Sequence, residues 1–408
     1  MNRILRFFSS PWRVLGLLCL LGGSYAGFLR CTRGLGAATN LSDTFPWGLW
    51  VGFDVVCGVG LAAGGFTVSA MVYILNIEKY KPIARPAVLT AFIGYMLVVG
   101  GLMFDLGHPW RIWHPIVMWN PHSVMFEVAW CVTLYTLVLA AEVSAMVFER
   151  LRWARTTRIA HRATFPLTLA AVLLSMLHQS SLGSLFLIVP GRLHELWYTP
   201  LLPLLFFLSA MGVGLVMTII ESNLSARAFG RAIEADVLRD AARLAAIILS
   251  IYLVVRGVDL IRTGALLNLW PLSRAGVFFL LEITIGFIIP IMLFSTERIR
   301  RNSRWLYHAA QMTLLGFIIN RLNVSITGFE LVSGKTYVPA WTEIAVTLML
   351  VTLGVTAFYV AARLFPVFEH DVLAEERART WRLEIDRRQS APKMAPASGL
   401  GGTKGREG

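Results

Sequence analysis

Residues 47–76 read WGLWVGFDVVCGVGLAAGGFTVSAMVYILN and hold one charged side chain, Asp54. A run of 18 or more apolar residues with few charges is long enough to cross a bilayer as a helix. The stretch therefore predicts a membrane span, the second of ten along the chain. The other nine are expected at about 14–30, 87–107, 122–148, 163–189, 199–221, 243–263, 274–296, 305–323 and 341–365.

The composition supports an all-α polytopic membrane protein. Hydrophobic residues make up 56% of the 408 residues and charged residues only 15%, whereas soluble domains carry about 25% charged residues. The N-terminal apolar run resembles a signal peptide, but Arg30 and Arg33 follow it without a small-residue cleavage site. We therefore interpret this run as the first span, and a soluble domain with a membrane anchor is excluded.

The net charge of +13 does not indicate a nucleic-acid partner, because the basic residues lie in short clusters between apolar runs. If the N-terminus is cytoplasmic, the inner segments before the tail hold 19 Lys and Arg residues and the outer segments hold 7. Cytoplasmic loops carry such an excess of positive charge. The distribution predicts ten spans with both termini in the cytoplasm.

A faint internal repeat relates the two halves of the chain. Span 3 ends LVVGGLMFDLGH and span 7 ends LVVRGVDLIRTG, which aligns Asp105 with Asp259 at an offset of 154. Span 4 begins SVMFEVAW and span 8 contains VFFLLEIT, which aligns Glu127 with Glu282 at an offset of 155. The nearly constant offset predicts two related helix bundles, with chance similarity between apolar helices as the alternative.

The repeat divides the chain into predicted parts. Residues 1–366 form the ten-helix membrane domain. Within it, spans 2–5 (47–189) and spans 6–9 (199–323) each form a four-helix bundle, and spans 1 and 10 are peripheral. Residues 367–408 are charged at first and then rich in Gly, Ala, Pro and Lys, which predicts a largely disordered cytoplasmic tail.

Ionisable residues inside the first bundle mark the expected active site. An ionisable side chain near mid-membrane costs about 3 kcal/mol or more and is a functional candidate. Asp54, Glu127 and His178 lie in spans 2, 4 and 5, and Asp105 ends span 3. Because the outer halves of these spans hold no Arg or Lys, we expect the acids to exchange protons with His178. The alternative is that they cap helix ends or form local hydrogen bonds.

Two further features point to the same bundle. The loop between spans 3 and 4 carries His108, Arg111, His114 and Trp119. With Asp54, these residues are predicted to line the mouth of a binding pocket, although the tryptophans are equally typical of a membrane interface.

Span 4 carries Glu127, Cys131, Tyr135 and Glu142 within about 80° of one helix face. Tyr135 and Glu142 are therefore candidates for a proton path toward the cytoplasm. The alternative is a polar seam between packed helices.

The second bundle combines two acids with two bases, Arg256, Asp259, Glu282 and Arg321. Balanced charges of this kind are typical of buried ion pairs that hold helices together. A structural role is therefore predicted for this bundle.

The chain lacks motifs for resident metal centres. It has four cysteines and no CxxC, so neither an iron–sulfur cluster nor a c-type haem is indicated. Only His178 lies deep in a span, whereas a membrane b-type haem takes two facing histidines. We expect no haem and no metal in this chain.

Four segments carry a resemblance to a known family: FPWGLWVGFDVVCGVGLAAGGFTVSAMVYI, RPAVLTAFIGY, WNPHSVMFEVAW and LHQSSLGSLF. They resemble the NrfD/PsrC family of membrane quinone-reactive subunits, with the strongest likeness to the HybB-type subunit of nickel–iron hydrogenases. The resemblance covers nearly all of Leu15 to Pro366. It implies a bacterial inner-membrane protein that is not catalytic alone.

The resemblance also implies partners and roles. It implies electron exchange between menaquinone or ubiquinone and a periplasmic, ferredoxin-like iron–sulfur subunit, which a hydrogenase or other dehydrogenase subunit supplies. The family positions that bind and protonate the quinone match His178, Asp105 and Glu127 and the loop between spans 3 and 4.

Two other function classes remain. A b-type cytochrome subunit would require a second deep histidine. An ion or proton transporter is suggested by the repeat and the intramembrane charges, but the two bundles are parallel and only the first keeps uncompensated acids.

Overall fold

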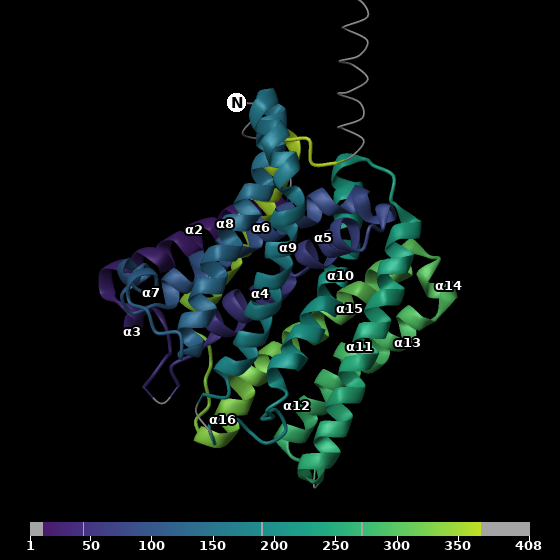
Figure 1. The fold of residues 1–408 in the computed structure, drawn as a ribbon. Coiled ribbons are helices and arrows are strands. Elements are labelled where there is room, and N and C mark those ends of the chain that lie inside the picture. The colour runs from purple at the N-terminus through teal and green to yellow at the C-terminus, as the bar shows by residue number, and fades with distance from the viewer. Residues whose placement is uncertain (1–10, 44, 189–190, 271, 369–408) are drawn as a thin grey trace, which may run out of the picture. The chain divides into compact units, whose positions relative to one another are not determined.

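A computed structural model describes residues 11–43, 45–188, 191–270 and 272–368 of the chain (Figure 1). Within these residues the chain is almost entirely helical, and no strand forms beyond one isolated bridge between Ser42 and Phe45. Ten helical segments are long and apolar enough to cross a membrane. The protein is thus an integral, multi-pass membrane protein, and the all-α, ten-span prediction is confirmed.

Seven spans are continuous α-helices. They are α2 (Pro11–Arg33), α6 (Lys81–Asp105), α8 (Val124–Leu151), α9 (Ala154–Leu185), α10 (Leu202–Phe229), α11 (Ala235–Thr263) and α17 (Trp341–Leu364). A single 3₁₀ turn, η3 (Glu78–Tyr80), precedes α6.

Three spans include wider π-helical turns. The second span consists of η1 (Trp50–Cys57), α4 (Gly58–Leu61), α5 (Gly64–Ser69) and η2 (Ala70–Ile74). The eighth consists of α12 (Arg274–Ile283), η6 (Thr284–Ile288) and α13 (Ile289–Ser295), and the ninth of α15 (Ser303–Leu322), η7 (Asn323–Thr327) and α16 (Gly328–Ser333). The short connecting helices are α3 (Leu35–Ala38), η4 (Pro109–Arg111), α7 (His114–Val117), η5 (Ala265–Leu269) and α14 (Glu297–Arg300).

Several helices extend beyond the apolar runs that predicted them. Helix α9 begins at Ala154 instead of about 163, and α11 begins at Ala235 instead of about 243. The added turns are rich in Ala and Arg, which are strong helix formers, so the helices continue beyond their apolar segments. The predicted tail, 367–408, lies outside the described residues except for Val367 and Phe368.

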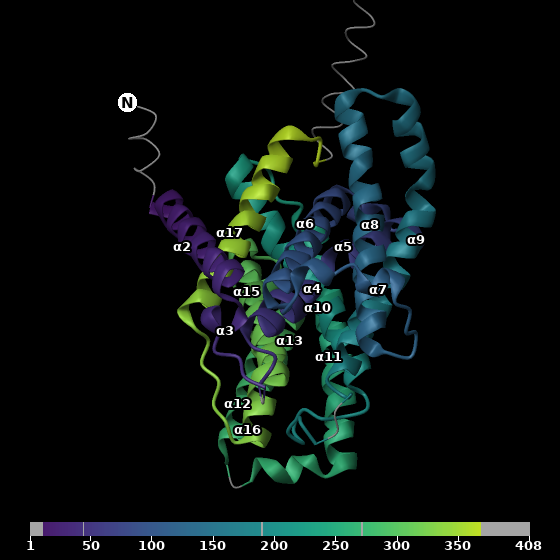
Figure 2. The ribbon, with the colours of Figure 1, turned by 90° about the vertical axis from the view of Figure 1, so that its left-hand side faces the viewer.

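The spans assigned to each predicted bundle, here called the first group (spans 2–5) and the second group (spans 6–9), contact one another, and α10 also contacts α9 and α5. Within the first, the second span contacts α6 and α9, α6 contacts α8, and α8 packs along α9. Within the second, α10 contacts α11 and α15, α11 contacts α13, and α15 contacts η6. Helix α2 packs along α17, which also contacts α6. In Figure 2 the pair of α2 and α17 lies on the opposite side of the fold from the pair of α8 and α9.

The two groups meet where two glycine backbones touch. A Cβ atom on Gly64 of α5 would lie 2.8 Å from the carbonyl oxygen of Gly214 of α10, and one on Gly214 would lie 2.7 Å from the Gly64 nitrogen. Side chains at either position would therefore force α5 and α10 apart. This close approach encloses the second span, which places the neighbouring polar side chains in a rigid part of the fold.

Candidate functional site

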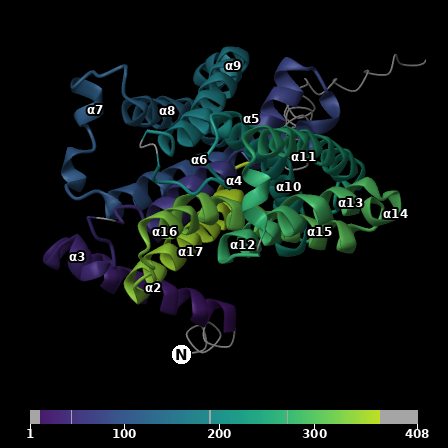
Figure 3. The same ribbon diagram turned by 90° about the horizontal axis from the view of Figure 1, so that it is seen from below.

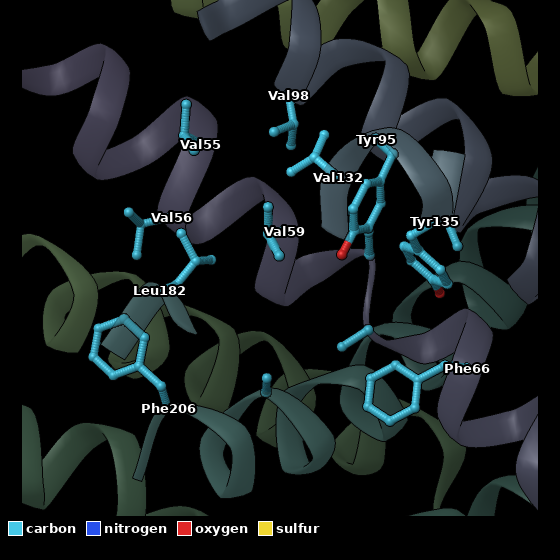
Figure 4. Close-up of a cluster of buried hydrophobic side chains, with 14 of the residues drawn as sticks. Val55, Val56, Val59, Phe66, Tyr95, Val98, Val132, Tyr135, Leu182 and Phe206 are labelled. Atoms are coloured by element: carbon cyan, nitrogen blue, oxygen red, sulfur yellow. The ribbon is translucent and has the colours of Figure 1, made fainter. Parts of the chain in front are cut away.

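His178 of α9 lies in the centre of the first group of helices and is fully buried. Its Nδ1 atom is 2.9 Å from the hydroxyl of Tyr95 on α6. The Tyr95 ring packs edge-on against Tyr135 of α8, with centroids 4.5 Å apart. Figure 4 shows these two tyrosines among apolar neighbours such as Val132 and Phe66. Three helices thus bring an imidazole and two phenols into one apolar cluster.

His178 Nε2 lacks a hydrogen-bond partner within the described residues. The Tyr135 hydroxyl and Ser175 Oγ form no well-aligned hydrogen bond there, but Ser175 lies close enough to the hydroxyls of Tyr95 and Tyr135 to interact with both. A buried polar group without a partner costs about 1–3 kcal/mol, so native proteins satisfy nearly all of them. The Nε2 atom of His178 is therefore available as a hydrogen-bond partner for a further polar group.

The interface between α8 and α9 is a polar seam. Ser181 donates a hydrogen bond of 2.6 Å to Glu127, and Thr168 donates one of 2.9 Å to Glu142. Tyr135 lies between these pairs on α8 and is fully buried. The seam that the sequence left as an alternative is thus present, and it places acids near both of its ends.

Glu127 lies shallower than the sequence predicted. We expected it about 8 Å inside its span, but α8 begins at Val124, so Glu127 is in the first turn and exposed. Glu127 contacts Ser181, which lies one turn from His178 on α9. The carboxylate therefore lies between the exposed surface of α8 and α9 and the buried cluster around His178.

Asp54 lies in a different place from His178. Thr347 of α17 donates a 2.7 Å hydrogen bond to the Asp54 carboxylate. A Cβ on Gly101 of α6 would lie 2.8 Å from the Asp54 Cβ, so the two backbones are close. Asp54 thus belongs to the contact between the second span, α6 and α17. Asp54 has no hydrogen bond to His178 within the described residues, and its part in the quinone site stays a prediction.

Asp105 is separated from His178 along the helix axis. It lies ten residues after Tyr95 on α6, which corresponds to about 15 Å of rise and places it near Arg30 and Glu343. Arg30 of α2 donates to the carbonyl oxygens of its neighbours Phe104 and Leu106, at 2.7 and 2.5 Å.

A second expectation, that the acids of the first bundle have no cation nearby, is changed by the position of Arg30. From the sequence, Arg30 appeared to lie in an outer loop. The helix α2 continues to Arg33, and the Arg30 side chain is only 6% exposed at the end of α6. A long side chain on the peripheral span thus supplies the positive charge beside Asp105.

Glu343 of α17 is a buried acid that the sequence reasoning missed. It accepts hydrogen bonds from the Tyr337 hydroxyl and from the backbone nitrogens of Asn40 and Ala340. Burial, together with this hydrogen bond to Glu343, raises the pKa of Tyr337 above its usual range, so the phenol stays protonated as a donor. The Glu343 cluster joins the loops before the second and tenth spans and has no unpartnered carboxylate oxygen.

The loop between α6 and α8 lies along α8 and does not cover the His178 cluster. The Trp130 indole donates a 2.8 Å hydrogen bond to the Pro115 carbonyl, and Trp119 stacks near Trp130 with ring centroids 5.0 Å apart. Trp130 is about 9 Å from the start of α8. Figure 3 shows α7 at the edge of the fold, beside α8.

The predicted ligands of this loop are solvent- or lipid-facing. His108, Arg111 and Trp119 are exposed, and His114 is half-buried. None of them forms a hydrogen bond or a ring contact with His178, Asp105 or Glu127 in the described part of the chain. The loop therefore borders α8 from the outside.

A cavity of about 70 Å³ lies at the other end of the seam. Its lining includes Tyr73, Arg85, Glu142 and His161. Arg85 forms a two-pronged ion pair with Glu149, at 2.8 and 2.9 Å, and His161 Nε2 is 2.9 Å from the same carboxylate. A water occupies about 30 Å³ of liquid, so the cavity has room for a short water chain beside Glu142.

In the second group, Arg256 and Asp259 form a buried ion pair of 2.7 Å. Thr199 donates a 2.8 Å hydrogen bond to the other Asp259 oxygen, and Arg256 also donates to the Leu196 carbonyl. The pair therefore ties α11 to the chain segment before α10.

Glu282 and Arg321 are linked through Asn320 and form no direct ion pair among the described residues. Asn320 donates to Glu282 at 2.6 Å and accepts from Arg321 at 2.5 Å. Trp197 and Asn323 also donate to Glu282, at 2.8 and 2.9 Å. The direct pairing that the charges suggested is thus replaced by neutral hydrogen-bond donors.

Arg321 is enclosed on its other sides. Its guanidinium donates to the Phe206 carbonyl at 3.1 Å and the Ser209 hydroxyl at 2.8 Å. It also lies over the rings of Phe206 and Phe317, 3.8 and 4.4 Å from their centroids. The guanidinium is thus held by protein atoms at Nη1 and Nη2, whereas its Nε has no partner within the described residues.

Sequence reasoning missed several partners of the site. Tyr95 ends the segment RPAVLTAFIGY that carried the family resemblance, yet its hydroxyl could be paired with His178 only after the helices were packed. Ser175 and Ser181 each lie three residues from His178 on α9, and this spacing was the available signal. No group of three or more metal-ligating side chains is present in the part of the chain described here.

Comparison with known proteins identifies relatives along most of the chain. The family model for polysulphide reductase NrfD matches residues 37–333. A protein of Nitratidesulfovibrio vulgaris is 36% identical over 375 residues, 88% of this chain and 95% of the relative. The probable Ni/Fe-hydrogenase 2 b-type cytochrome subunit of Escherichia coli is 31% identical over 344 residues, 83% of this chain and 87% of the relative. A menaquinone reductase integral membrane subunit of N. vulgaris is 29% identical over 382 residues, covering 86% and 89%.

Proposed function

The chain belongs to the polysulphide reductase NrfD family, and on this premise we propose that it is the quinone-reactive membrane subunit of a respiratory oxidoreductase. It binds menaquinone or ubiquinone in its first bundle, spans 2–5. Electrons pass between the quinone and an iron–sulfur subunit on the outer face. The relatives named as hydrogenase and menaquinone reductase subunits support this proposal.

The His178 cluster is the observation that carries the proposal. When the Tyr95 hydroxyl donates to Nδ1, the imidazole keeps its proton on Nε2, which then donates to a quinone oxygen. Tyr135 and Ser175 offer further hydroxyls to the same ligand. The bound quinone supplies the electron-accepting ring, and this chain supplies binding, orientation and protons.

Proton delivery follows the seam between α8 and α9. Glu127 exchanges protons with the surroundings at the exposed end of the seam, where Ser181 connects it to the turn that carries His178. Glu142 holds one at the other end, beside the cavity that contains Arg85 and His161. Tyr135 lies between the two ends. These groups move protons to and from the buried cluster.

The quinone enters from the lipid beside α8. The first turn of α8 is exposed at Glu127, and Trp119 of the preceding loop packs next to it against Trp130. The loop residues His108, Arg111 and His114 border this entrance and do not touch the quinone ring. Asp105 and Asp54 orient the helices α6, α2 and α17 around the site.

Within the complex, the partner is an outer ferredoxin-like iron–sulfur subunit joined to a nickel–iron hydrogenase or another dehydrogenase subunit. The complex resides in a bacterial inner membrane with both termini of this chain in the cytoplasm. The second bundle, with its buried hydrogen-bond network around Arg321, is a structural partner of the first.

Substitution of Tyr95 by phenylalanine tests how His178 is held. Loss of the hydroxyl leaves Nδ1 without its partner, and we expect the rate of quinone reduction by the purified complex to fall by about 10-fold. The matched control is Tyr252→Phe, which removes a buried tyrosine hydroxyl next to Asn320 in the second bundle. Equal rates for the Tyr95 variant and the unmodified complex would remove Tyr95 from the site.

The name of the E. coli relative raises a second candidate, a b-type cytochrome subunit. Such a haem takes two facing histidines, and His178 is the one histidine that is buried within a described span. Its Nδ1 is engaged by Tyr95. We therefore predict that the chain purified without its partners shows no haem Soret or α-band in its absorption spectrum. A stoichiometric b-type spectrum would favour the cytochrome.

A further inference from the structure

A groove of about 590 Å³ runs along the outside of the second bundle. One wall is a single face of α11, where residues recur at the helical spacing of three and four. The other wall is the end of α13 together with α14. The residues that line it are Arg243, Ala246, Ile247, Ser250, Ile251, Val254, Val255, Phe294, Ser295 and Arg300.

One end of the groove is basic. Arg300 is only 9% exposed, and its Nη1 donates to the Phe294 carbonyl. A guanidinium has five N–H groups, so Arg300 keeps donors for a ligand. Arg243 is exposed on the facing wall and has neither an ion pair nor a hydrogen bond within the described residues. Two arginines, Arg243 and Arg300, thus line the same groove from its two walls.

No carboxylate lines the groove. The acids nearest in sequence are paired elsewhere: Asp240 with Lys79, and Glu297 with Arg301. The positive charge of this end is therefore not neutralised by the protein, which favours an anionic ligand.

The remainder of the groove is apolar. Ile247, Ile251 and Val254 are 52%, 48% and 64% exposed along α11. The distance from Arg243 to Val255 along the helix is about 18 Å, which is close to half of the roughly 30 Å hydrocarbon core of a bilayer. A ligand that follows this wall thus has a charged head and an apolar tail about one leaflet long.

We propose that this groove binds one anionic glycerophospholipid. Its phosphate lies between Arg243 and Arg300, and an acyl chain lies along Ile247, Ile251 and Val254. Basic recesses between membrane helices bind anionic headgroups in this way. The lipid bridges α11 and the end of α13, and the site is independent of the quinone site in the first bundle.

Lipid titration of the purified full chain in detergent, followed by native mass spectrometry, tests the proposal. Phosphatidylglycerol is the anionic probe and phosphatidylcholine the neutral one. We expect the unmodified chain to bind one phosphatidylglycerol several-fold more tightly than phosphatidylcholine. Arg243→Gln should weaken phosphatidylglycerol binding by about five-fold, the effect of one surface arginine. Ser250→Trp, which fills the groove without changing its charge, should weaken it as well.

The matched control is Arg262→Gln, an exposed arginine at the other end of α11, which should bind the lipid like the unmodified chain. Inorganic phosphate at millimolar concentration should not displace the lipid, because it lacks the acyl chain. Equal binding of both lipids, unchanged binding by the Arg243 variant, or displacement by phosphate would each overturn the proposal. If Ser250→Trp fails to fold, the exposed Arg243 variant decides the question.

Discussion

Replacing His178 with phenylalanine is expected to slow quinone reduction by at least about 100-fold, while the protein still inserts and assembles with its partners. A positioned acid–base group contributes about 10²–10⁴ to a rate. Phenylalanine keeps the ring volume in the buried position but removes both nitrogens. The Tyr95 hydroxyl then loses its partner, and Nε2 is no longer present for a quinone oxygen.

The measurement is the turnover of the purified complex with a soluble quinone analogue, at saturating electron donor. His308→Phe is the control, because His308 is an exposed histidine of α15 that contacts only Gln311 and nearby rings. The control should turn over at the rate of the unmodified complex. Full turnover by the His178 variant would remove this residue from the mechanism.

Replacing Arg321 with leucine is expected to have the largest effect on stability. Removal of one partner from a buried charged network costs about 3–5 kcal/mol. Without Arg321, Glu282 remains as the charged side chain of this network. Asn320, the Phe206 carbonyl and Ser209 also lose the guanidinium as their hydrogen-bond donor. We therefore expect a clear drop in the melting temperature of the detergent-purified chain and less protein in the membrane.

Two variants give this prediction its controls. Arg321→Lys keeps the charge but not the planar donor geometry, so it should melt between the leucine variant and the unmodified chain. Arg262→Leu removes an exposed arginine of the same group and should melt like the unmodified chain. An Arg321→Leu variant with normal melting would show that the network does not hold the second bundle together.

These two substitutions separate the proposed roles of the bundles. The His178 variant should lose activity and keep its stability, whereas the Arg321 variant should lose stability first. The difference follows from the surroundings of each residue. Nε2 of His178 has no protein partner within the described residues. Arg321 also has an unpartnered Nε there, but its Nη1 and Nη2 are held by hydrogen bonds and its guanidinium lies over two aromatic rings.

The number and order of the spans could be predicted because apolar runs report membrane insertion directly. The run at residues 47–76 became the span Trp50–Ile74, within a few residues. The first turns of α9 and α11 could not be located from hydropathy. These turns are rich in Arg and Ala, and they continue each helix beyond its apolar run.

The site was less predictable, because which helix faces meet depends on how the helices rotate against one another. His178 was identified as a buried ionisable residue, but its partner Tyr95 lies 83 positions away. Asp105 shares α6 with Tyr95 but lies ten residues further along the helix, next to the Phe104 carbonyl that accepts from Arg30. Arg30 itself was misplaced because a long side chain on a peripheral span reaches a neighbouring helix end.

Photoaffinity labelling with an azidoquinone tests the central claim most directly. The purified complex is labelled, digested and mapped by mass spectrometry, with the His178→Phe variant in parallel. The account predicts label on peptides of α8 and α9, between Glu127 and Tyr135 and around Ser175–Ser181, and loss of that label in the variant. Label confined to peptides of α10 to α16, or unchanged labelling of the variant, would contradict a quinone site at His178.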